Sequence, residues 1–190
     1  MRVDVIDNGG QWTHREWRVL RNLGVESTIL PNTIESSRLD GCDGIVLSGG
    51  APSINSELSK LGNIASYIDD HSFPVLGICV GAQFIALHFG GQVGPGTVPE
   101  YGKNTITISE HNDIFKGIPD TLTVWENHND EVKVLPDDFV ISATSDTCRI
   151  QAFHHRKKPI WGVQFHPEVD NTEHGKEMFL NFLEVCGNRR

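Results

Sequence analysis

The sequence predicts an α/β fold: an open, mostly parallel sheet with a mixed edge and helices on both faces, of the flavodoxin-like type. Apolar strand-like runs alternate with amphipathic helical segments through about the first ninety residues. Glycine, proline or asparagine follows most of these runs and ends them. Beyond residue 94, strand-like runs follow one another without a clear helix between them, so we expect antiparallel strands there.

The first half of the chain supplies the parallel strands. Residues 2–6 form a short apolar run that predicts a strand, and residues 14–23 carry apolar side chains at helical spacing. Residues 25–30 predict a second strand, which Pro31 ends. Strand–helix–strand units of this kind are right-handed and place helices on both faces of a sheet. The same reasoning predicts strands at 44–47 and 75–78, and helices at 56–68 and 81–89.

The second half is predicted to extend or flank this sheet. Its strand-like runs are separated by turns, and a final helix at 175–186 has Met178, Phe179, Phe182 and Leu183 on one face. We expect strands at 105–109, 122–125, 140–144, 150–153 and 160–163.

Composition narrows the class of protein. The 190 residues fit one domain, 1–190, and the formal net charge of −9 argues against a nucleic-acid-binding surface. No secretory signal or membrane span is visible, and the four cysteines lack metal-binding spacing. We therefore expect a cytoplasmic protein with reduced thiols and no metal or membrane partner.

The sharpest local feature surrounds Cys79. An apolar strand runs into Gly77-Ile-Cys-Val-Gly81, and a helix follows at once. Flanking glycines permit a tight strand–turn–helix elbow that lifts a nucleophile above the carboxyl edge of the sheet. A helix N-terminus there favours the thiolate, and the N–H of Val80 is free to stabilise an oxyanion. The alternative is a small apolar core cysteine.

A nucleophilic cysteine needs a base, and His166 is the best placed of nine histidines. It follows an apolar strand, and Pro167 holds the segment extended. Residues two apart in an extended segment share a side, so Glu168 can reach the imidazole and orient it. The alternative is a strand-end histidine with an ordinary hydrogen bond.

Two polar segments are candidates for further roles. Gly49 and Gly50 end the strand at 44–47, so their N–H groups can approach a ligand and complete an oxyanion hole. Residues 125–132 are polar and loop-like between strands. Plain turns would explain both segments equally well.

Taken together, these motifs resemble those of the class I (triad) glutamine amidotransferases over essentially the whole chain. The carriers are Ser48-Gly-Gly50, Gly77-Ile-Cys-Val-Gly-Ala-Gln83 and Gly162-Val-Gln-Phe-His-Pro-Glu168, in the family's order. The resemblance implies catalytic residues Cys79, His166 and Glu168, an oxyanion hole at Gly50 and Val80, and glutamine binding by Gln83, Asn127, His128, Asn129 and Asp130.

Within the family, the chain resembles the amidotransferase part of GMP synthetase. Asp7-Asn-Gly-Gly-Gln11 is similar to its opening motif, and residues 125–132 are similar to its Ser-His-Gly-Asp loop, although Asn127 and Asn129 depart from that pattern. No segment resembles an ATP-pyrophosphatase domain. The resemblance therefore implies a free-standing subunit without a cofactor of its own, whose partner subunit uses ATP and Mg²⁺ to aminate XMP.

Three alternatives remain at this point. The same family also serves anthranilate, aminodeoxychorismate and carbamoyl-phosphate synthesis, with different partners. A non-catalytic regulatory module would keep the fold without turnover. A cysteine peptidase or γ-glutamyl hydrolase on a similar fold would release no free ammonia.

Overall fold

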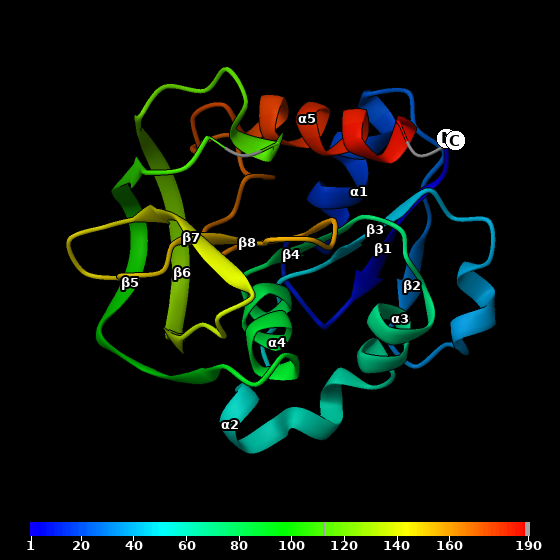
Figure 1. Ribbon diagram of the computed structural model, residues 1–190, viewed down its shortest axis with the longest axis horizontal. Coiled ribbons are helices and arrows are strands. Elements are labelled where there is room, and N and C mark those ends of the chain that lie inside the picture. Colours follow the sequence, from blue (N-terminus) through cyan, green and yellow to red (C-terminus); the bar gives the residue numbers. More distant parts are fainter. Residues whose placement is uncertain (112, 189–190) are drawn as a thin grey trace.

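A nine-stranded sheet forms the centre of the protein in the computed structural model, which describes residues 1–111 and 113–188 (Figure 1). The strand order is β2-β1-β3-β4-β9-β8-β7-β5-β6. The strands are β1 (Val3–Asp7), β2 (Ile29–Pro31), β3 (Gly44–Leu47), β4 (Val75–Ile78), β5 (Gln92–Ile108), β6 (Thr121–Val134), β7 (Phe139–Thr144), β8 (Ala152–His155) and β9 (Ile160–Val163).

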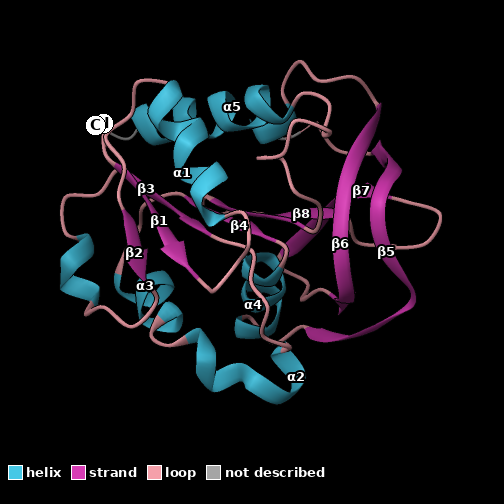
Figure 2. Cartoon of the chain, turned by 180° about the vertical axis from the view of Figure 1, so that it is seen from behind, coloured by secondary structure: helices cyan, strands magenta, loops and turns pink. Residues whose placement is uncertain are grey.

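The first part of the sheet is parallel, from β2 through β1, β3 and β4 to β9. Every residue of β3, β4 and β9 is buried, as expected for short apolar strands covered on both faces. Helices α1 (Thr13–Asn22) and α5 (Gly175–Gly187) cover one face, while α3 (Ile64–Asp70) and α4 (Val80–His88) cover the other (Figures 1 and 2).

The second part is antiparallel, from β9 through β8, β7 and β5 to β6. The long strands β5 and β6 pair over most of their length and curl away from the parallel part (Figure 2). The predicted α/β class is confirmed. The antiparallel part contributes as many strand pairings as the parallel part, so it is more than an edge of the sheet.

The prediction of a single helix at 56–68 is wrong. The chain forms α2 (Ile54–Glu57), a 3-10 helix at Leu58–Leu61 and then α3. Gly62 separates them with a φ of 56°, and a Cβ there would lie 2.4 Å from the carbonyl oxygen of Asn32. A positive φ does not occur within a right-handed helix, so the helix is interrupted at this glycine.

The loop predicted at 125–132 is also wrong, because these residues belong to β6. Their polar sequence lacks the apolar alternation typical of a strand, and they form one by pairing with β5, which precedes them in the sequence. Similarly, the strand predicted at 25–30 is reduced to Ile29–Pro31 and one isolated bridge between Arg2 and Glu26. Within the described residues, β2 is the outermost strand and pairs with β1 on one side only.

The carboxyl ends of the parallel strands meet at one edge of the sheet. There the chain leaves β1 at Asp7, β3 at Leu47, β4 at Ile78 and β9 at Val163. In open α/β sheets this edge is where ligands bind. Among the described residues, no helix is long and apolar enough to cross a membrane.

Candidate active site

Cys79 occupies a strained elbow between β4 and α4. Its backbone has φ 49° and ψ −107°, a conformation that costs free energy in a non-glycine residue. Its N–H donates to the carbonyl of Val163 (2.8 Å) and its carbonyl accepts from the N–H of Gln83 (3.0 Å). These two bonds hold the turn, so the strain is maintained by the sheet on one side and the helix on the other.

The two glycines that flank Cys79 are required by close packing. A Cβ on Gly81 would lie 2.3 Å from the carbonyl oxygen of Leu47, and one on Gly77 would lie 2.6 Å from Cδ1 of Ile85. Both contacts are shorter than real Cβ atoms make. The helix can therefore begin directly above the sheet, as the sequence predicts.

His166 lies beside Cys79 and is oriented by a carboxylate. Its Nδ1 is 2.7 Å from Oε1 of Glu168, and both side chains are buried. The backbone also fixes it, since its N–H donates to the carbonyl of Trp125 (3.0 Å) and its carbonyl accepts from the hydroxyl of Thr172 (2.7 Å). The ring of Trp12 packs edge-on at 4.5 Å. The predicted histidine–glutamate pair is thus present in the structure.

The environment of His166 favours its charged form. Burial lowers its pKa, but the charge of Glu168 and the contact with the Cys79 thiol outweigh burial and raise that pKa well above its usual value. Its Nε2 is buried without an acceptor in hydrogen-bond geometry among the described residues. Such contacts commonly tighten only when substrate binds. A histidine that retains its proton beside a thiol favours a thiolate–imidazolium pair.

The loop after β3 closes over this pair. A Cβ on Gly49 would lie 3.0 Å from Cε1 of His166 and 3.7 Å from Cβ of Cys79. The side chain of Asn8 anchors the loop by donating to the carbonyl of Ser48 (2.9 Å). Glycine at Gly50 leaves room for the carbonyl of Asn8, which a Cβ would meet at 2.5 Å.

Two hollows meet at Cys79. A small one of about 90 Å³ lies between the loop after β1 and His166, and a larger one of about 370 Å³ extends toward the β5–β6 hairpin. Gly50 and Asn127 line both. Val80 lines the larger hollow and is the first residue of α4, so its N–H has no acceptor within the helix. Cys79 therefore faces a cavity and lies beside the amino-terminal end of α4.

All five residues predicted to bind glutamine line the larger hollow, and they differ in how exposed they are. Asn127 and Asn129 lie on the wall of the larger hollow, and Asn129 accepts a bond from the hydroxyl of Tyr101 (2.7 Å). His128 is 5% exposed and uses both ring nitrogens in contacts within the protein. Asp130 accepts a bond from the hydroxyl of Ser53 (2.9 Å). Gln83 is also buried and bonded within the protein.

This geometry agrees with comparisons to known proteins. The family model for class-I glutamine amidotransferases matches residues 4–186. The chain belongs to this family. Among curated proteins, it is 57% identical to a glutamine-hydrolysing GMP synthase subunit of Thermoplasma acidophilum over 100% of this chain and 95% of the relative. It is 60% identical to the protein of the same name from Thermoplasma volcanium, over 98% and 92%.

Solved structures give the same picture for this amidotransferase. The crystal structure of a protein assigned as a GMP synthase subunit, from Thermoplasma acidophilum, superposes with a TM-score of 0.96 at 57% identity, covering 99% of this chain and 94% of the other. A glutamine amidotransferase from Thermotoga maritima, 23% identical, superposes with a TM-score of 0.77 over 99% of this chain and 83% of the other, which shows the shared fold.

Two residues near Cys79 of this amidotransferase were not predicted from the sequence. Nε2 of Gln164 lies 3.6 Å from the sulfur of Cys79. Glu16 is 1% exposed and accepts a bond from the N–H of Gly49 (3.3 Å). Burial and the charge of Glu168 raise the pKa of Glu16 well above its usual value. The available signals were a polar residue directly after an apolar strand and an acid four positions before a buried leucine, and neither identifies a contact with Cys79.

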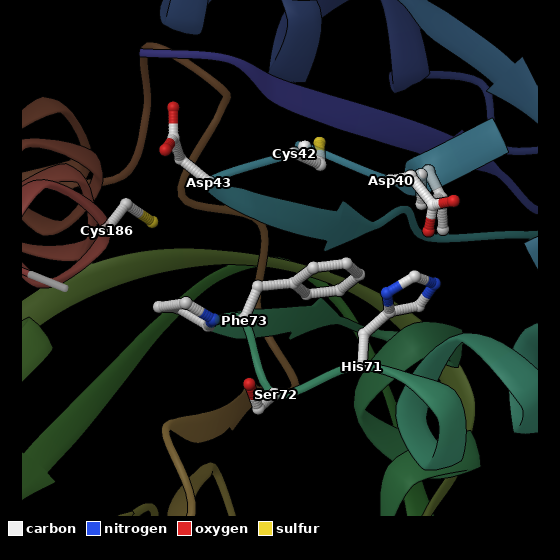
Figure 3. Close-up of a pocket in the computed structure, with 10 residues that line it drawn as sticks. Asp40, Cys42, Asp43, His71, Ser72, Phe73 and Cys186 are labelled. Atoms are coloured by element: carbon white, nitrogen blue, oxygen red, sulfur yellow. The ribbon is translucent and has the colours of Figure 1, made fainter. Parts of the chain in front are cut away.

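A separate hollow of about 440 Å³ lies at the opposite, amino-terminal edge of the sheet (Figure 3). Cys42 and His71 both line it. Burial and the charge of Asp4 raise the pKa of Cys42 to about 11. His71 is bonded to Ser36 and stacked on Phe73. The thiol there stays protonated at neutral pH, so this cysteine is a poor nucleophile.

Proposed function

We propose that this protein is the glutaminase subunit of a two-subunit GMP synthetase, with residues 1–190 as one amidotransferase domain. It hydrolyses glutamine and passes ammonia to a separate ATP-pyrophosphatase subunit, which uses ATP and Mg²⁺ to aminate XMP to GMP. The observation that carries the chemistry is the buried set of Cys79, His166 and Glu168 at the carboxyl edge of the sheet. Full-length similarity to proteins named as glutamine-hydrolysing GMP synthase subunits supports the pathway.

The first half-reaction forms a thioester. The Cys79 thiolate attacks the carboxamide carbon of glutamine, and the N–H groups of Gly50 and Val80 bind the resulting oxyanion. Each such donor typically contributes about 3 kcal/mol to transition-state stabilisation. The imidazolium of His166 gives its proton to the departing nitrogen, the C–N bond breaks, and ammonia leaves.

The second half-reaction releases glutamate. The now neutral His166 takes a proton from water, whose oxygen attacks the thioester carbon. The C–S bond breaks, Cys79 leaves as thiolate, and His166 again carries the proton it holds at the start. Glu168 keeps the imidazole in position and stabilises its charged form in both halves.

The test is ammonia release from glutamine by the purified chain, alone and with the candidate ATP-pyrophosphatase subunit, XMP, ATP and Mg²⁺. We expect release to rise with the complete mixture and to vanish in Cys79→Ala. Stimulation by a synthetase for anthranilate, aminodeoxychorismate or carbamoyl phosphate in place of this partner would move the protein to a sibling pathway. No ammonia release in any mixture would favour a non-catalytic regulatory module.

A further inference from the structure

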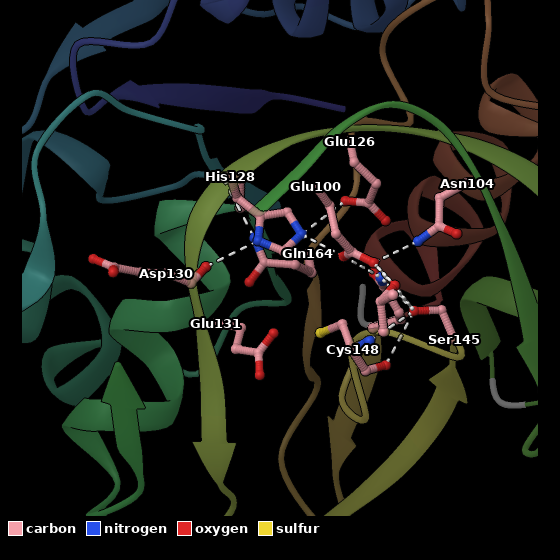
Figure 4. Close-up of polar contacts among 12 residues, drawn as sticks. Glu100, Asn104, Glu126, His128, Asp130, Glu131, Ser145, Cys148 and Gln164 are labelled. Carbon is pink, nitrogen blue, oxygen red and sulfur yellow. Dashed lines mark hydrogen bonds and ion pairs between the residues drawn. The ribbon is translucent and has the colours of Figure 1, made fainter. Parts of the chain in front are cut away.

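A buried charged cluster lies in the β5–β6 hairpin, next to the larger hollow (Figure 4). Nε2 of His128 is 2.8 Å from Oε2 of Glu100 and 3.2 Å from Oε2 of Glu126. All three side chains are at least 94% buried. Glu100 also accepts bonds from Asn104 and Gln151. The cluster is therefore closed to solvent and held from several sides.

The contacts of His128 define its protonation. Its Nε2 faces two carboxylates, and its Nδ1 is 3.1 Å from the carbonyl oxygen of Asp130. A carbonyl oxygen and ionised carboxylates can only accept hydrogen bonds, while a neutral imidazole offers one donor. Both nitrogens are satisfied only if each carries a proton. Burial lowers the pKa of His128, but its bonds to Glu100 and Glu126 outweigh burial and raise it to about 10.

The same Asp130 carbonyl connects this cluster to the nucleophile. Nε2 of Gln83 donates to it (2.7 Å) and also donates to Oε1 of Gln164 (3.1 Å). Nε2 of Gln164 in turn lies 3.6 Å from the sulfur of Cys79. Gln83 and Gln164 are each 2% exposed, so water does not compete for these bonds.

The direction of every bond in this chain is fixed. Because Gln83 faces a carbonyl, its nitrogen must point that way, and that nitrogen's second hydrogen meets the oxygen of Gln164. The amide of Gln164 therefore presents its N–H, and not its oxygen, to Cys79. A donor directed at sulfur stabilises the thiolate more than the thiol, because bonds to a charged acceptor are stronger.

We propose that Gln164 is a positioning residue that donates its amide N–H to the Cys79 sulfur and favours the thiolate. Gln83 holds Gln164 in that orientation, and His128, as an imidazolium, holds the Asp130 carbonyl to which Gln83 is bonded. The inference rests on the proposed glutaminase function. It gives His128, which also lines the larger hollow, a role that acts through other side chains.

The decisive variant is Gln164→Met, which keeps about the length of the side chain and removes the donor without adding a charge. Cys79 is titrated with iodoacetamide without glutamine, by intact-mass spectrometry across pH. We expect alkylation at pH 7 to slow about tenfold, the value of one charge-assisted hydrogen bond, and the alkylation profile to move to higher pH. In the glutaminase assay kcat falls while the KM for glutamine is unchanged. Gln92→Met, on the exposed surface of β5, is the matched control.

A double variant tests the chain of bonds. Gln83→Leu alone removes the bond that orients the Gln164 amide. The amide can then rotate and direct its oxygen at the sulfur part of the time, so alkylation slows by a smaller factor. Added to Gln164→Met it has no further effect on alkylation, because without glutamine Gln83 influences the Cys79 sulfur through Gln164. Additive losses, or a raised KM with unchanged alkylation, would overturn the proposal. Thermal unfolding of each variant shows whether the fold is retained.

Two further outcomes separate this proposal from others. Because alkylation needs no glutamine, a slowed rate in a chain without glutaminase activity would support the positioning role and overturn only the proposed function. The donor atoms of Glu100, Glu126 and His128 lie within 4.8 Å of one another, close enough for a divalent ion to replace the proton. If elemental analysis finds one equivalent of metal in the purified protein, the claim that His128 is an imidazolium would be contradicted. Less than about a tenth of an equivalent supports it.

Discussion

Cysteine and histidine lie together at both edges of the parallel sheet, Cys79 with His166 at the carboxyl edge and Cys42 with His71 at the amino edge. The carboxyl-edge histidine is bonded to a buried glutamate, whereas His71 is bonded to Ser36. The residue types are the same at the two edges. What differs is the charge around each pair.

The backbone differs as well. Cys79 sits at a positive φ directly before a helix, whereas Cys42 precedes a strand and its thiol donates to the carbonyl of Gly44 (3.2 Å). The asymmetry follows from chain direction, because parallel strands deliver helix N-termini to one edge only. Chemistry at Cys79 is thus a consequence of topology together with a few charged side chains.

The largest expected effect comes from removing the charge that orients the histidine. Glu168→Gln should lower kcat for glutamine on the order of 10³-fold, because a neutral amide neither fixes the tautomer nor stabilises the imidazolium. The equivalent change at the other edge, Ser36→Ala, removes the hydroxyl bonded to His71, keeps its contact with the Ser36 carbonyl, and should leave kcat unchanged. Steady-state ammonia release measures both. Equal losses in the two variants would erase the distinction between the edges.

Alkylation should separate the two thiols next. Near pH 7, iodoacetamide is expected to modify Cys79 at least about a hundredfold faster than Cys42, whose pKa is raised to about 11 by burial and by Asp4. Peptide mass spectrometry after short exposure gives both rates. Comparable rates in the folded protein would contradict the assignment, while comparable rates in urea are expected because the environments are then lost.

Glycine substitutions should distinguish the two backbones. Gly81→Ala should destabilise the fold by about 3 kcal/mol, because its Cβ would meet the carbonyl oxygen of Leu47 at 2.3 Å. Gly41→Ala, at the amino edge, has φ +74° and nothing within 4 Å, so only the left-handed conformation opposes it, at about 1–2 kcal/mol. Urea unfolding measures the difference. A larger loss at Gly41 would show that the elbow is less tightly packed than described.

The smallest effect concerns pH. The folded-state pKa of His128 is about 10 and its ordinary value is 6.5, so its ion pairs contribute stability that is complete below pH 6.5. That contribution is lost progressively as pH rises from 6.5 toward 10. The charged or titratable groups that face it are Glu100, Glu126 and Cys79. Urea unfolding between pH 6.5 and 10 should show a shallower decline in Glu126→Gln, and an equal slope would count against the pair.

The sequence predicted those features that depend on neighbouring residues. The elbow at Cys79 and the pairing of His166 with Glu168 follow from glycines, a proline and spacing within a few positions. Features set by distant segments were missed. Residues 125–132 become a strand only because β5 pairs with them, and Gln164 reaches Cys79 through contacts across 85 residues of chain. No local pattern encodes either partner.

The most direct test of the central claim is to find the covalent intermediate. The protein, with its synthetase partner and nucleotides, is quenched in acid during glutamine turnover and digested at low pH. Peptide mass spectrometry then locates any γ-glutamyl thioester. We predict the glutamyl group on Cys79, with none on Cys42. Ammonia release with the glutamyl group on another cysteine, or with no thioester at any cysteine, would contradict the account.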